Sequence, residues 1–272
     1  MLTPKDYYDR FFKISAFAEP YGMIGPFSVH RYRNLSHSSG KVETSAYEGM
    51  RLKDKIIGAL RSRYKKITGK HQNGDLIVIP EASAADWFQG IGLVIQKTAI
   101  VAAFAGKGRP ATISNAITCG LSTGVMNLDT IYGDLELMGL DCNGFVGGYA
   151  FERGVTGADG HLGPSTEPST FAARGIARET WDDVRAHDIL LTPGSPQHIR
   201  IVHAKYADTI EVCESASSLK GLSWRQYRVV GDAYGDTQVQ GRKGEARMFK
   251  LRRSTQSGGT SDHWVLISRV GL

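Results

Sequence analysis

The chain has few of the features that mark membrane, disulfide-rich or zinc-ribbon proteins. Its apolar stretch at residues 100–105 is far shorter than the ~20 residues that a membrane-spanning helix needs. Only three cysteines are present, Cys119, Cys142 and Cys213. An odd count in a large chain argues against a disulfide framework and indicates a free thiol. The absence of a CxxC pair excludes a zinc ribbon.

The first residues lack the pattern of a secretory signal. Pro4 and Asp6 stand where such a signal needs a basic patch followed by an apolar run. We therefore expect no signal peptide and a chain that is cytoplasmic as synthesised. Any export would then use a non-classical route.

The overall composition is that of a globular protein with an excess of basic residues. The 272 residues are 41% hydrophobic and 22% charged, which fits one large domain or two modest ones and argues against disorder. The net charge of +6 favours an anionic partner such as nucleic acid, a membrane surface or a cell-wall polymer. Charge alone does not choose among these.

The first half of the chain indicates one helix followed by one strand. Apolar residues between 51 and 67 recur at spacings of three and four, which predicts an amphipathic helix. Residues 76–79 then form a short apolar run that Pro80 ends. This helix and the strand Gly-Asp-Leu-Ile-Val-Ile-Pro resemble the second half of a LysM carbohydrate-binding module. Any other helix-turn-strand unit would give the same pattern.

Residues 107–124 are rich in Gly, Ser and Thr and are expected to connect two domains. The predicted division is an accessory region at 1–125, with wall binding as one role for it, and a second domain at 126–272. Since the residues that carry chemistry all lie after Tyr132, the first region is expected to contribute no catalytic group.

The first segment with candidate catalytic residues is Gly-Leu-Asp-Cys-Asn-Gly-Phe-Val, at residues 139–146. Asp141 is a good N-cap, and Phe145 and Tyr149 then lie on one face of the predicted helix. Cys142 falls in the first turn, where free backbone N–H groups and the helix dipole favour a thiolate. A buried, inert cysteine is the alternative for this segment taken by itself.

Three apolar segments that follow predict consecutive strands at 188–192, 198–203 and 209–214. A cysteine at a helix start, a histidine on one strand and a polar residue on the next are what a papain-like thiol site needs. The base must reach the sulfur, and a third group must hold the imidazole ring in place. His198 and Glu214 occupy those two places.

The same segments resemble the NlpC/P60 cysteine peptidases over residues 130–220. Leu-Asp-Cys-Asn-Gly-Phe-Val is similar to the family's Asp-Cys-Ser-Gly-Phe/Leu-Val, and His-Asp-Ile-Leu-Leu to its Gly-Asp-Leu-Leu-Phe. His-Ile-Arg-Ile-Val is similar to His-Val-Gly-Ile-Tyr, and Ile-Glu-Val-Cys-Glu-Ser-Ala-Ser to Val-Ile-Glu-Ala-Ser. The resemblance implies an α+β, papain-like fold in which a cysteine-bearing helix packs on an antiparallel sheet.

Carried over by position, the resemblance implies a Cys-His-Glu site. Cys142 would be the nucleophile, His198 the general base and Glu214 the residue that orients the imidazole. Tyr132, Asp141 and Asn143 would surround the oxyanion and the substrate. The expected reaction is hydrolysis of a peptide bond in peptidoglycan, with no metal and no organic cofactor.

The chain departs from the family pattern at three positions. Asn143 stands where serine is usual, His187 replaces the glycine before Asp188, and Arg200 replaces a glycine on the base strand. The arginine would narrow or charge the cleft.

Two alternatives to this assignment stay open. His263 also begins an apolar strand and competes with His198 as the base, although no strand follows it to supply an orienting residue. The protein could instead be a non-catalytic wall-binding or phage-tail module on the same fold. A nucleic-acid binder ranks third, because the basic run at 242–253 permits it while no recognised nucleic-acid motif is present.

Overall fold

The computed structural model describes residues 1–33, 44–68, 97–157, 160–194, 197–255 and 258–271. By their contacts these residues form two compact units. Arg10–Leu140 form one, here called the helical unit. Met1–Asp9 and Asp141–Leu272 form the other, the barrel unit. The contacts thus divide the chain at Leu140 and Asp141, whereas the sequence analysis placed its boundary between residues 125 and 126, and the barrel unit includes the N-terminus.

The helical unit combines a β-hairpin with helices. Its elements are β1 (Ile14–Ala18), β2 (Gly22–Phe27), α2 (Thr44–Thr68), α4 (Lys97–Phe104), α5 (Pro110–Ser122) and α6 (Ile131–Leu135). Strands β1 and β2 pair antiparallel, and α5 packs against β1 and α4. The predicted helix at 51–67 is confirmed within α2, because Leu52, Ile56, Ile57 and Leu60 form its buried face. The predicted strand at 76–79 lies outside the described residues.

The expected connection at 107–124 was wrong, since most of it forms helix α5. Pro110 occupies the first turn, where its missing N–H costs nothing, and Ile113 and Ile117 are fully buried on one face. Glycine is required at position 120 of this helix because a Cβ there would meet the Met126 side chain within 2.6 Å. This glycine therefore serves close packing, and the Gly/Ser-rich composition did not indicate a loop.

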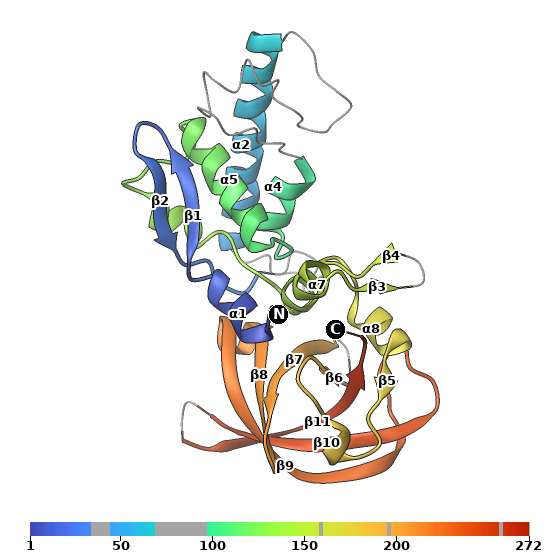
Figure 1. Cartoon of the computed structure of the whole chain (residues 1–272). Helices are drawn as coiled ribbons and strands as arrows, with labels where there is room; N and C mark the ends of the chain where they lie inside the picture. The colour runs from blue at the N-terminus through green and yellow to red at the C-terminus, as the bar shows by residue number, and fades with distance from the viewer. Residues whose placement is uncertain (34–43, 69–96, 158–159, 195–196, 256–257, 272) are drawn as a thin grey trace. The chain divides into compact units, whose positions relative to one another are not determined.

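The barrel unit is built on six antiparallel strands that close on themselves (Figure 1). The order is β10-β9-β8-β7-β6-β11, and β10 also pairs with β11. These strands are β6 (Ile189–Thr192), β7 (His198–Lys205), β8 (Thr209–Ala216), β9 (Gly221–Asp236), β10 (Glu245–Ser254) and β11 (Thr260–Arg269). Short β5 (Ile176–Ala177) adds to the outside of β11. The three strands predicted at 188–192, 198–203 and 209–214 are confirmed as β6, β7 and β8.

Alternate residues of these strands fill the barrel with apolar side chains. The interior cluster comprises Val184, Leu190, Val202, Ile210, Val212, Tyr227, Phe249, Leu251, Val265 and Ile267. The 3₁₀ helix η1 (Trp181–Asp183) covers one end, where the Trp181 ring packs on Phe249 and its indole N–H donates to the carbonyl of Ala207. That end of the barrel is therefore apolar and closed.

Helices cover the outside of the same barrel. Helix α7 (Cys142–Glu152) packs against β7 and β8, and Tyr7 of α1 (Pro4–Arg10) lies 5.6 Å from Phe145 and 5.7 Å from Tyr149, measured between ring centroids. The remaining elements of the unit are β3 (Thr156–Gly157), β4 (Gly160–His161), α8 (Pro168–Arg174) and η2 (Ser217–Leu219). The chain is thus an α+β protein in which the cysteine-bearing helix packs against an antiparallel six-strand barrel.

Among the residues that the structure describes, no helix combines the length and the apolar character needed to cross a membrane.

Candidate functional site

Cys142 opens helix α7, as predicted, and Asp141 caps it. The Asp141 carboxylate accepts a 2.6 Å hydrogen bond from the N–H of Gly144, and its carbonyl accepts the N–H of Phe145. The Cys142 side chain is buried, and its thiol donates to Oδ1 of Asn143 at 3.3 Å. Asp141 therefore holds the first turn in shape, and Asn143 contacts the sulfur that the resemblance makes the nucleophile.

His198 and Glu214 lie together, as the sequence analysis expected. Nε2 of the imidazole is 3.0 Å from Oε2 of Glu214. Because a carboxylate accepts only, the imidazole carries its proton on Nε2 and leaves the lone pair of Nδ1 on the opposite side of the ring. This is the geometry of a base held by an orienting carboxylate.

Glu214 is buried at the centre of a wider set of hydrogen bonds. Its Oε2 also accepts from Nε of Arg200 at 2.9 Å, and its Oε1 accepts from the Tyr227 hydroxyl at 2.6 Å. Burial by itself raises the pKa of Glu214, but the Arg200 charge and the bonds from His198 and Tyr227 outweigh it and bring the pKa well below its usual range. Glu214 is therefore an anion at neutral pH.

The same surroundings keep His198 neutral. Burial is the largest cause of the lowered pKa of His198, and the Arg200 and Arg253 charges act in the same direction, while the Glu214 bond opposes them. A neutral imidazole is the form that can accept a proton from a thiol.

The strand register sets the direction in which these side chains point. Arg200 and Val202 alternate with Ile201 on β7, and Glu214 follows Cys213 on β8, so His198, Arg200 and Glu214 share the face of interior Val202. Cys213 points the other way, toward Lys5 and Asp9 of α1, and burial raises the pKa of its thiol well above the usual range. A pairing of Cys142 with His198 therefore has to form at the rim of the barrel, where β7 begins, and it stays a prediction.

His263, the competing base, belongs to the same end of the barrel. It pairs with Leu251 across β10 and β11 and so faces inward, and its Nε2 lies 3.0 Å from Oγ of Ser261. Burial lowers the pKa of His263, and Arg200, Arg253 and His198 lower it further. We call His198, Arg200, Glu214, Tyr227 and His263 the barrel-end cluster. Tyr227 was not assigned to this site from the sequence, because the strand order that places β9 two strands from His198 is a feature of the tertiary structure.

Tyr132 lies in the helical unit, on α6. Its side chain is 71% exposed, and its ring is 6.4 Å from that of Phe27. Its expected part in stabilising an oxyanion stays a prediction.

His187 has a backbone conformation that is uncommon for residues other than glycine. Its φ is +74°, in the left-handed region that glycine adopts without a steric cost. The imidazole is held by Tyr149, whose hydroxyl lies 2.6 Å from Nδ1 of His187. The neighbouring Asp188 pairs through both oxygens with Arg178.

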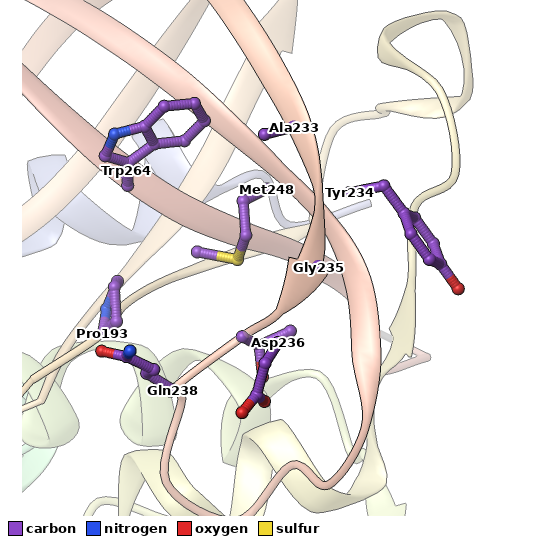
Figure 2. A pocket seen from close by; sticks show the side chains of 9 residues that line it. Pro193, Ala233, Tyr234, Gly235, Asp236, Gln238, Met248 and Trp264 are labelled. Atoms are coloured by element: carbon purple, nitrogen blue, oxygen red, sulfur yellow. The ribbon is translucent and has the colours of Figure 1, made fainter.

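A pocket of about 290 Å³ opens on the outer face of the barrel, where the ends of β6 and β9 meet Met248 of β10 and Trp264 of β11. Figure 2 shows Trp264 across from Gln238 and Asp236, with Met248 between them and the Tyr234 ring turned away. Trp264 directly follows His263 and therefore faces the opposite side of the strand. The pocket offers an apolar floor and one carboxylate, and its lining was not predictable from the sequence because its residues come from four separate segments.

In the part of the chain that the structure describes, no group of three His, Cys, Asp or Glu side chains is arranged to hold a metal ion. The three cysteines are all unpaired by disulfides and buried.

No protein family, curated protein or solved structure matches this chain.

Proposed function

We propose that the protein is a cysteine peptidase or amidase of the NlpC/P60 type that hydrolyses peptide bonds of peptidoglycan. The observation that carries this proposal is the hydrogen bond between His198 and buried, ionised Glu214. These are the two residues that the sequence pattern pairs with Cys142, and α7 packs on the strands that carry them. A papain-like fold is the arrangement in which these elements would act together.

The proposed mechanism uses only side chains and backbone groups of the barrel unit. Nδ1 of His198 takes the thiol proton, and the Cys142 sulfur attacks an amide carbonyl to give a tetrahedral adduct. Free N–H groups of the first turn of α7 stabilise the oxyanion. The imidazolium then protonates the leaving amine, and water releases the thioester with His198 again acting as base. Glu214 keeps the imidazole in the required tautomer and stabilises its charge.

Digestion of purified peptidoglycan tests the proposal. Wild-type protein is expected to release peptides that mass spectrometry identifies by a new amine and a new carboxyl terminus, and Cys142→Ala is expected to release none. His203→Ala is a matched control, because His203 packs on Trp224 near α1 rather than in the barrel-end cluster. Release that is equal in wild type and Cys142→Ala would refute the thiol mechanism.

One observation favours a non-catalytic wall-binding or phage-tail module as the second candidate. The thiol of Cys142 donates to Asn143, and the His198 imidazole is turned to the barrel interior with Arg200 and Tyr227. A barrel whose end binds a ligand without turnover would use the same residues. Binding to peptidoglycan that survives Cys142→Ala, together with no hydrolysis by wild type, would select this candidate.

A further inference from the structure

Two arginines at the end of the barrel opposite η1 form no ion pair with a carboxylate of the described residues. Arg225 is paired with interior Val212 across β8 and β9, and Arg253 is paired with Ser261 across β10 and β11, two residues beyond interior Leu251. Both therefore point inward at the end opposite η1. The structure records no ion pair for Arg225 or Arg253 with any residue that it describes.

Among the described residues, Glu214 is an acidic side chain that faces inward at this end, and it already has three donors. Its carboxylate accepts hydrogen bonds from His198, Arg200 and Tyr227. The positive charge of Arg200 balances the negative charge of Glu214. Arg225 and Arg253 consequently leave this end of the barrel with an excess of positive charge.

Two buried side-chain donors of this barrel also lack hydrogen-bond partners among the described residues. Nε of Arg253 is shielded from solvent and has no hydrogen-bond partner, and the same holds for Oγ of Ser223, which pairs with Glu214 across β8 and β9. Buried polar groups in native proteins are nearly always satisfied, by protein, water or a ligand. Nε of Arg253 is such a donor, and an oxyanion would suit it, because the planar fork of a guanidinium matches a carboxylate with two parallel hydrogen bonds.

Arg253 lies close enough to the proposed base for its charge to affect it. The Arg253 charge contributes to lowering the pKa of His198 and of His263, and it acts in the same direction on Tyr227. Arg225 and Arg253 lie on neighbouring strands, at a diagonal spacing that places Cα atoms about 7–8 Å apart, which suits one anion held between two guanidinium groups.

We propose that Arg253 and Arg225, with Ser223, bind a carboxylate of the ligand at the end of the barrel opposite η1. The further statement that this carboxylate belongs to the substrate rests on the proposed function. The hydrolase would then prefer peptides that carry a free carboxylate near the scissile bond and would discriminate against the carboxamide form.

Histidine NMR of the full chain tests the site without any turnover. With ¹³C-labelled histidine, acetate is expected to shift the His198 and His263 resonances in a saturable way, whereas acetamide at equal concentration leaves them unchanged. Arg253→Gln is expected to raise the acetate Kd at least about tenfold, and Arg253→Lys less. Arg252→Gln is the matched control, because Arg252 points outward and pairs with Asp262. No saturable shift with acetate, an equal Kd in Arg253→Gln, or a response to inorganic phosphate alone would overturn the carboxylate site.

Peptide substrates separate this inference from the proposed function. If both hold, wild type has a lower KM for the carboxylate peptide than for its carboxamide, and Arg253→Gln loses that difference with kcat little changed. Acetate binding without hydrolysis would refute the hydrolase and keep the site. Hydrolysis with equal KM for both peptides would refute the substrate carboxylate.

Discussion

Glu214 is the residue on which the chemistry of the barrel end depends. It joins an imidazole, a guanidinium and a phenol at distances of 2.6 to 3.0 Å, all within the barrel. Because the carboxylate is buried, each of these donors is needed to offset the loss of water. Arg200 stands where the pattern of the resembled family has a small residue. Its guanidinium therefore compensates the charge of the Glu214 carboxylate, which orients His198.

Two alanine variants distinguish His198 from His263 as the base. His198→Ala is expected to lower turnover about as much as Cys142→Ala, by a factor on the order of 10³ or more, because groups that act as one unit give non-additive losses. His263→Ala is expected to retain most activity. Steady-state hydrolysis and the rate of iodoacetamide alkylation of Cys142 measure this, with alkylation falling in His198→Ala only. The reverse pattern would make His263 the base.

Ionised Glu214 is expected to make the stability of the fold depend on pH in acid. The pKa of Glu214 is depressed in the folded state, so its ionisation stabilises the fold at pH values above the unfolded pKa of about 4.3, and this contribution is lost as the pH falls below it. Urea denaturation is expected to give a lower unfolding free energy at about pH 3 than at about pH 6. In Glu214→Gln, and partly in Tyr227→Phe, this difference is expected to shrink. Glu211→Gln, on the opposite face of β8, should keep the wild-type difference; equal differences in all variants would contradict the assignment.

At the scale of the element, the start of α7 decides how the proposed nucleophile is presented. The helix has a side-chain cap from Asp141, whereas the N-cap of α8, Glu167, makes no such bond. The side-chain cap fixes the direction of the first-turn N–H groups, which the proposed mechanism assigns to the oxyanion.

Asp141→Ala is therefore expected to lower the unfolding free energy by about 1 kcal/mol. The loss of a buried cap also loosens the first turn, so the same variant is expected to lower kcat more than KM. Glu167→Ala, at an exposed cap without a hydrogen bond, should change neither quantity by more than the measurement error. Chemical denaturation and steady-state kinetics of both variants provide the comparison, and equal effects would show that the cap has no special role.

At the scale of the whole molecule, the barrel unit is assembled from both ends of the chain. Tyr7 is fully buried against α7, the phenol of Tyr149 donates to the carbonyl of Leu2, and Lys5 lies over the Trp224 ring at 4.8 Å. The first nine residues thus belong to the core of a unit whose other residues begin at Asp141.

Deletion of Met1–Asp9 is expected to destabilise the barrel unit by at least about 3 kcal/mol, since it removes a fully buried aromatic side chain. Hydrogen exchange of β8 amides in the deleted and intact chains measures this. A fragment of residues 126–272 is expected to show the same loss, and joining Met1–Asp9 to Asp141–Leu272 through a flexible linker should restore protection. Unchanged exchange on deletion would show that α1 contributes nothing to the barrel.

The sequence by itself determined the local elements of the barrel unit and the pairing of one base with its carboxylate. Asp141 before an apolar helix face, and apolar alternation at β6, β7 and β8, depend on neighbours within a few residues, which is why they were predictable. His198 and Glu214 followed from their place on adjacent strands.

Only the tertiary structure decided the rest. Helix α5 was mistaken for a connection because Gly120 is there to fit Met126, a contact that composition cannot reveal. Barrel closure through β10 and β11 brings Arg253 and His263 to the end where His198 lies. The attachment of Met1–Asp9 to a unit that resumes at Asp141 likewise depends on contacts between residues far apart in the chain, and no local periodicity specifies those.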